Sequence, residues 1–128
     1  MKKIVFVVEK TSDGFSAYAL DDGIAVGTSA NNISELKTNI VDAYNSYAEM
    51  EGKKQVSIDD IQIQLDVPQF FDYYNIINAS ALGARIGMDK TLISQYVNGH
   101  KTPGPRQIQK ILNGIKQLGE ELSSLELA

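Results

Sequence analysis

The chain has 128 residues, enough for one domain or two small ones, and its hydrophobic content of 43% supports a packed core. No apolar run approaches the ~20 residues that a membrane-spanning helix needs. The sequence has no cysteine and one histidine, which excludes disulfides, thiolate metal sites and a histidine-rich metal site. We therefore expect a soluble cytoplasmic protein that binds no membrane and carries no metal and no cofactor.

The charge is unevenly distributed along the chain. The net charge is −4, yet residues 1–69 carry six Lys/Arg against eleven Asp/Glu, a net of −5, and residues 70–128 carry six against five, a net of +1. Residues 78–116 hold six basic side chains and one acid, Asp89, a net of +5. A basic stretch of this kind is the electrostatic signature of a nucleic-acid-binding element.

Three strands are predicted at the start of the chain. Residues 3–10 are β-branched and aromatic and predict a buried strand, although their lysines and short apolar run superficially suggest a signal peptide. A turn at 11–14 leads to a second strand over 15–20, which completes a hairpin. Another turn at 21–23 precedes a short third strand near 24–28.

A helix and a fourth strand complete the first half. Asn32 and Glu35 have the spacing of a capping box, and apolar residues then recur every three or four positions up to about residue 50. This periodicity predicts one buried helix face, formed by Ile33, Leu36, Ile40, Ala43, Tyr44 and Tyr47. Residues 61–65 alternate strictly between apolar and polar, so they predict a strand with one solvated face. The predicted order is β-β-β-α-β.

The second half predicts only helices. Residues 67–77 are rich in aromatic side chains and are expected to form a helix that supports the core. Two short helices follow over 79–86 and 90–97, with Gly87 at the sharp turn between them, which is the arrangement of a DNA-binding helix–turn–helix. Asn78 and Asp89 supply the N-caps, and Ile86, Met88, Ile93 and Tyr96 the apolar set between the helices.

The last predicted helix begins near Pro105 and carries a seven-residue apolar repeat. Ile108, Ile115 and Leu122 form one series, and Ile111, Leu118 and Leu125 the other. Residues 108–115 are expected to pack on the helix–turn–helix core, and residues 118–125 to pair with a second copy of the chain; both interpretations can hold together. Gly114 and Gly119 weaken the helix by ~1 kcal/mol each relative to alanine.

The helix over 90–97 has the composition of a DNA-reading helix, with apolar residues on one side and hydrogen-bonding residues on the other. Lysine can donate to guanine or to a phosphate, glutamine can hold adenine with two hydrogen bonds, and the threonine methyl can pack on thymine. Ordinary solvation is the alternative at each position. Arg106 could hold a phosphate, whereas Arg85 is expected to form a surface ion pair. The predicted DNA-binding residues are Lys90, Thr91, Ser94, Gln95, Asn98, His100 and Lys101, with no catalytic residue and no metal ligand.

A family pattern is carried by Gly83, Ile86-Gly87-Met88, Ile93, Tyr96, Asn98-Gly99 and Pro103. On these residues, positions 78–112 resemble the helix–turn–helix of the Xre/Cro-type repressors. The resemblance places the DNA-reading positions at Lys90, Thr91 and Gln95. Ala79 stands where that family often has glutamine, and Gly83 where it favours alanine.

A second pattern comprises Asp13-Gly14-Phe15-Ser16-Ala17-Tyr18, the Gly27-Thr28 pair and the helix over 33–48. On these residues, positions 1–50 resemble the HicB antitoxin domain, a partial RNase H-like fold. A HicB-like domain over 1–66 followed by a helix–turn–helix domain over 67–128 is the order of one class of HicB antitoxins. The resemblance implies an α+β fold, with a β-β-β-α-β domain followed by an all-α lambda-repressor-like domain. It further implies a double-stranded DNA operator, autorepression of a type II toxin–antitoxin operon, a HicA-like ribonuclease toxin as partner, and a homodimer or higher homo-oligomer.

Two other functions remain open from the sequence. An RNase H-like fold can hold magnesium through converging carboxylates, and the acids available are Glu9, Glu35, Asp42 and Asp66. Because the inward positions of the first strand and helix are apolar, we expect these acids on the surface and no enzymatic activity. The other alternative is a stand-alone DNA-binding regulator whose first domain senses another protein or a small ligand.

Overall fold

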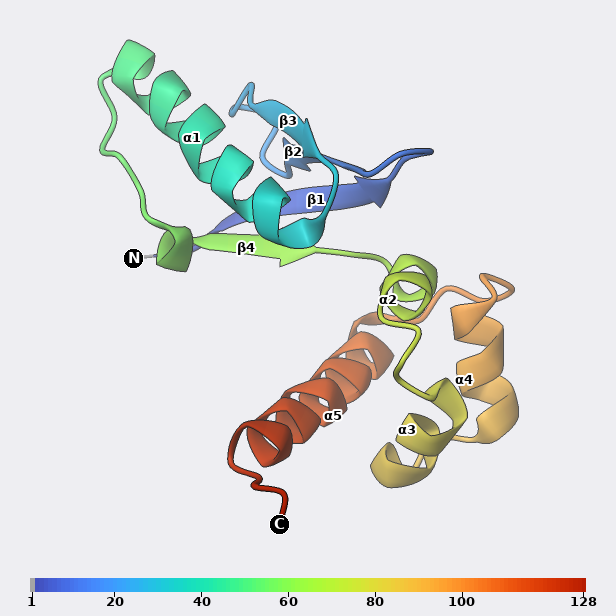
Figure 1. Ribbon diagram of the computed structural model, residues 1–128. Helices are drawn as coiled ribbons and strands as arrows, with labels where there is room; N and C mark the ends of the chain where they lie inside the picture. Colours follow the sequence, from blue (N-terminus) through green and yellow to red (C-terminus); the bar gives the residue numbers. More distant parts are fainter. Residues whose placement is uncertain (1) are drawn as a thin grey trace. The chain divides into compact units, whose positions relative to one another are not determined.

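The computed structural model describes residues 2–128 and divides the chain into two compact units, the first ending at Asp66 and the second beginning at Val67 (Figure 1). Within these residues there are one four-stranded mixed sheet and five α-helices, so the fold class is α+β. None of the helices described is long and apolar enough to cross a membrane.

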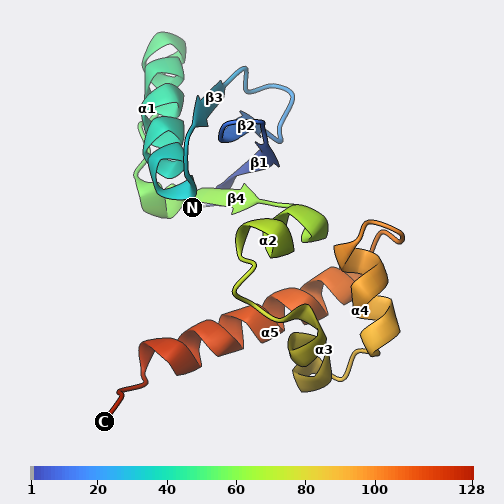
Figure 2. The same ribbon diagram turned by 45° about the vertical axis from the view of Figure 1, so that its right-hand side comes forward.

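The first unit is built on a sheet with the strand order β3-β2-β1-β4. Its strands are β1 (Ile4–Lys10), β2 (Phe15–Ala19), β3 (Gly27–Ala30) and β4 (Ile61–Gln64). The first three are antiparallel neighbours, whereas β4 runs parallel to β1. A parallel pair requires a crossover connection, and α1 (Ile33–Glu51) lies in it and packs on one face of the sheet (Figures 1 and 2).

The third strand lies later in the chain than the expected residues 24–28. Val26 is buried, but it belongs to the loop before β3. The strand itself consists of small and polar residues that pair with β2, and Gly14 lies so close to Ala30 that a Cβ at residue 14 would overlap the Ala30 carbonyl oxygen. The expectation was wrong because pairing across the sheet, rather than local hydrophobicity, sets this strand.

The helix α1 begins and ends as its sequence predicts. The Asn32 side chain accepts a hydrogen bond of 2.8 Å from the Glu35 backbone N–H, and Gly52 ends the helix in the left-handed conformation (φ 65°). Within the helix, the Asn45 amide oxygen accepts from the N–H of Val56 in the following loop (2.8 Å), and its NH2 group donates to the Val56 carbonyl (3.0 Å). The side chain therefore pairs with the loop as a strand would and holds it against α1.

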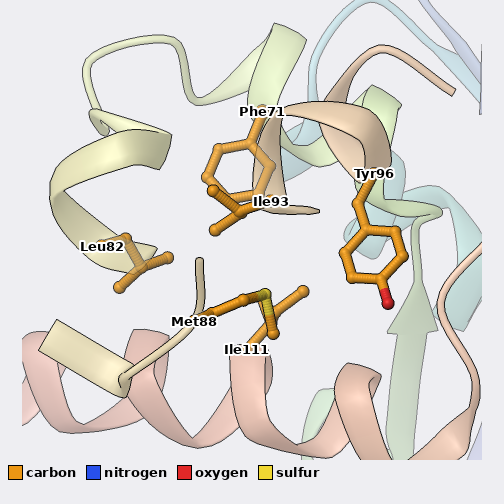
Figure 3. Close-up of a cluster of buried hydrophobic side chains, with 6 residues drawn as sticks. All are labelled: Phe71, Leu82, Met88, Ile93, Tyr96 and Ile111. Carbon is orange, nitrogen blue, oxygen red and sulfur yellow. The ribbon is translucent and has the colours of Figure 1, made fainter. Parts of the chain in front are cut away.

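The second unit contains α2 (Val67–Tyr73), α3 (Ala79–Ile86), α4 (Lys90–Val97) and α5 (Pro105–Ser123). The first of these is shorter than the expected 67–77, and Ile76, which falls within the expected helix, is almost fully exposed in the turn that follows. The core combines residues from all four helices and from the α3–α4 turn (Figure 3). It comprises Phe71, Leu82, Met88, Ile93, Tyr96 and Ile111.

Candidate nucleic-acid interface

Local signals fix the two helices and the turn between them. The Asn78 side chain caps α3 by accepting from the Ala81 N–H (3.0 Å), and the Asp89 carboxylate caps α4 by accepting from the Thr91 N–H (2.7 Å). Gly87 adopts φ 72°, a left-handed conformation that glycine takes without strain. The two short helices are therefore joined by a tight turn of fixed geometry.

Gly83 brings α3 and α4 close together. A Cβ at this position would lie 3.1 Å from Ile93 Cγ2 and 3.2 Å from the Met88 carbonyl oxygen. A larger residue than glycine would therefore be crowded here. Ile93 and Tyr96 are both buried on the inner side of α4. Their burial sets the rotation of α4 about its own axis and leaves the opposite side outward.

The helix α5 packs on this pair through the middle of its length. Ile111 is buried, and a Cβ at Gly114 would lie 2.5 Å from Ile86 Cγ2. The sequence had assigned Gly114 only a cost in helix stability, whereas the structure places it at a close helix–helix contact. Ile108, which was expected to pack on the core, is largely exposed. Leu122 and Leu125 are exposed as well, while Leu118 is half-buried.

Arg85 forms the surface ion pair that the sequence predicts. Its guanidinium donates to both carboxylate oxygens of Glu121 on α5, at 2.7 and 2.6 Å. This side chain is therefore engaged within the unit, and its charge is locally neutralised.

The outer side of α4 carries the predicted residues of this helix. Lys90, Thr91 and Ser94 are exposed, and Gln95 is half-buried. Asn98, at the C-cap, is exposed and donates from its amide to the Ser94 hydroxyl (3.3 Å). With 3.6 residues per turn, these positions form one continuous polar surface opposite the buried side. We call these five residues the α4 polar surface.

A shallow hollow of about 280 Å³ lies between this surface and the start of α3. It brings Lys90, Ser94 and Asn98 together with Asn78 and Ser80. Sequence reasoning missed Ser80, whose only signal was its position in the first turn of α3. The first N–H groups of a helix have no intrahelical acceptor, and only that of Ala81 is taken by the Asn78 cap, so the α3 start presents donors in a hollow that Lys90 also lines. This combination suits an anion such as a phosphate.

Backbone hydrogen bonds hold the segment after α4 to the end of that helix. The N–H groups of His100 and Lys101 both donate to the Gln95 carbonyl, at 2.9 and 3.2 Å, and Gly99 adopts φ 76°. Both side chains are exposed. The two side chains therefore extend the α4 polar surface, and the hydrogen bonds to Gln95 fix the position of their backbone.

The exposed charges on and around the α4 polar surface are mainly positive. Lys90, Lys101 and Arg106 are exposed, and the Asp89 carboxylate is occupied by its cap. In the first unit, the acids that were weighed as magnesium ligands, Glu9, Glu35, Asp42 and Asp66, are all exposed. Among the residues that the structure describes, no three His, Cys, Asp or Glu side chains are grouped so that they could hold a metal ion.

Comparison with known proteins adds no family assignment. No protein-family model matches the chain, and no curated protein matches it. The interface described above therefore depends on its own geometry.

Proposed function

We propose that the second unit binds double-stranded DNA in a sequence-specific manner, with α4 in the major groove. The observation that carries the proposal is the outward polar surface of α4, oriented by the burial of Ile93 and Tyr96. A helix–turn–helix positions its second helix in this way, with the N-terminal residues at the base edges. The arrangement agrees with the resemblance of residues 78–112 to Xre/Cro-type repressors.

Different residues of the surface take different roles in this proposal. Thr91, Ser94 and Gln95 contact base edges, since their side chains can pair with donors, acceptors or the thymine methyl. Lys90 lies beside the start of α3, where the hollow fits a backbone phosphate. Asn98, His100 and Lys101 follow the helix and contact phosphates, which set position rather than sequence preference. Binding should therefore weaken steeply as salt concentration rises.

We further propose that two copies bind an inverted repeat. Each chain offers one reading helix, and α5 continues beyond its contact with α3 through Leu118 and Leu122. It ends at Ser123, and Leu125, seven residues after Leu118, follows its end. Pairing of these leucines across a two-fold axis gives a homodimer. Its half-site centres should lie about 34 Å apart or a multiple of it.

The first unit has the role of partner binding in this proposal. Its resemblance to HicB antitoxin domains suggests a HicA-like ribonuclease toxin, and the whole chain would be a cytoplasmic antitoxin and autorepressor without enzymatic activity. An RNA-cleaving toxin needs a basic surface to bind its substrate, and residues 1–69 carry a net charge of −5. If no such toxin exists, the chain is a stand-alone regulator whose first unit senses another protein or a ligand.

A binding-site selection with random duplex DNA tests the central claim. Wild-type protein should enrich one palindromic motif, and Gln95→Ala should lose ~1–3 kcal/mol of binding free energy on it and relax the preference at one base pair per half-site. Gln55→Ala, at an exposed loop position in the first unit, is the matched control and should change neither. Absence of any enriched motif would refute sequence-specific binding. An unchanged base preference in Gln95→Ala would remove that residue from base reading.

A further inference from the structure

Strand β1 is apolar on both sides, yet α1 covers only one face of the sheet (Figures 1 and 2). Phe6 and Val8 are fully buried, which assigns them to the face that α1 covers. Val5 and Val7 alternate with them, so they lie on the opposite face, where they are half-buried. A strand with one solvated face normally alternates apolar and polar residues, as β4 does, whereas a continuous apolar run is typical of a strand covered on both faces.

The neighbouring strand adds two exposed apolar side chains to the same face. Tyr18 is paired opposite Val7, and the Leu20 N–H donates to the Val5 carbonyl (3.0 Å), which places Leu20 beside Val5. Tyr18 is 46% and Leu20 54% exposed. We call these four residues the β1–β2 patch.

Polar residues border the patch on the β4 flank. Gln62 and Gln64 of β4 are paired opposite Val5 and Val7, and both glutamines are exposed. On the other flank, Gly27 is paired opposite Tyr18 and leaves the side of the ring uncovered. An apolar centre with a polar rim is the composition of a protein–protein interface.

The surrounding charge selects the kind of partner. Residues 1–66 carry six Lys/Arg and eleven Asp/Glu, a net charge of −5. Glu9 follows Val7 and Lys3 precedes Val5 on the same side of the chain, and Asp21 and Asp22 follow Leu20, so acids outnumber bases beside the patch. A second copy would bring the same negative charge to the contact, and a nucleic acid would be repelled. A basic protein is attracted instead, and its approach is accelerated by the field.

We propose that the β1–β2 patch is the docking surface for a small basic protein with an apolar contact area, which binds across β1 and β2 on the face opposite α1. The proposal rests on the proposed function, because it assigns a surface to the partner of the first unit. Tyr18 provides the central contact, as buried aromatic side chains commonly dominate such interfaces.

The test uses the full-length chain and the purified, catalytically inactive product of a small basic reading frame next to its gene. Affinity is measured by calorimetry for the wild type, for Tyr18→Lys/Leu20→Lys, and for Met50→Lys/Ile58→Lys as a control. The control positions are 84% and 52% exposed, lie in α1 and in the 3-10 turn at Ile58–Asp60, and change the net charge equally. The patch variant should bind at least about 30-fold more weakly than the control. A milder variant, Tyr18→Thr/Leu20→Thr, keeps the test valid if the lysine variant fails to fold, because threonine is favourable in strands. It should bind at least about 10-fold more weakly than the wild type.

The outcomes separate this inference from the proposed function. No binding by the wild type would refute the toxin partner itself, and the docking surface with it. Binding by the wild type that the threonine variant retains in full would overturn only the docking surface. A lower molar mass of the unbound patch variant in light scattering, relative to both the wild type and the control, would assign the patch to contact between copies of the chain and would also overturn it.

Discussion

Replacement of Gly114 by alanine tests whether α5 is seated on α3 as the structure shows. In an open helix position this change stabilises by ~1 kcal/mol, because alanine loses less backbone entropy than glycine. At Gly114 the new Cβ would lie 2.5 Å from Ile86 Cγ2, at least about 1 Å inside ordinary carbon–carbon contact. The methyl is on a β-branched side chain of restricted rotation, so the helices must shift, at ~1–3 kcal/mol. The expected net change is a loss of ~0–2 kcal/mol.

Gly119 offers the matched control on the same helix. A Cβ there meets nothing within 4 Å, so Gly119→Ala should stabilise by up to ~1 kcal/mol. The difference between the two variants removes the helix-propensity term and isolates the steric cost of ~1–3 kcal/mol. Urea unfolding should be followed by NMR signals from the core of the second unit, such as those of Tyr96, because the first unit can unfold separately.

A double-mutant cycle completes this test. Ile86→Leu removes the offending methyl while keeping the side-chain volume, so it should restore much of the stability that Gly114→Ala loses. Equal stabilisation by Gly114→Ala and Gly119→Ala, with no coupling to Ile86, would show that α5 does not approach α3 at this point.

Three further predictions concern other contacts. Asn45→Ala should destabilise the first unit by about 1–3 kcal/mol in urea unfolding, because both Val56 backbone groups lose their partner; wild-type stability would contradict the clamp. Glu121→Gln should cost less than about 1 kcal/mol, since the side chains of the Arg85 pair are about half exposed, and the cost should shrink with added salt. Burial raises the pKa of Tyr74 above its ordinary value of 10.0, so the folded state favours the neutral phenol. This stabilisation by the neutral phenol is complete below pH 10 and is lost as pH rises through the raised pKa. Above pH 10 the wild type should therefore lose stability faster than Tyr74→Phe. Unfolding measured at several pH values, together with an ultraviolet titration of the tyrosines, checks this.

The elements with local start and stop signals could be predicted from the sequence to within about one residue. Asn78 and Asp89 carry cap side chains at α3 and α4, and Gly87 turns between them, so these boundaries depend on residues within one helical turn. The third strand lacked such a signal, because β3 is defined by its pairing with β2. The Asn45–Val56 clamp joins residues eleven positions apart through a side chain, and no sequence pattern marks it.

In the candidate site, too, the features that depend on one helix could be predicted from the sequence, and those that depend on packing between helices could not. Helical periodicity sufficed to place the α4 polar surface outward, since it depends only on which residues of one helix are apolar. The hollow beside Ser80 could not be predicted, because it arises where α3 meets α4 in space. Gln95 is half-buried rather than exposed, which also follows from packing rather than from periodicity.

The two close glycine contacts give the second unit a mechanical property that bears on DNA recognition. Gly83 lets α3 approach α4 closely, and Gly114 lets α5 approach α3 closely, because a Cβ at either position would crowd the facing helix. In the proposed dimer, α5 continues from this contact to Leu122, and Leu125 follows the end of the helix, so that both leucines lie at the two-fold axis. The distance between the two reading helices would then be transmitted through rigid packing and not through a loop. A fixed distance is what allows a dimer to reject half-sites at the wrong spacing, because the mismatch must be met by deforming the protein core or the DNA.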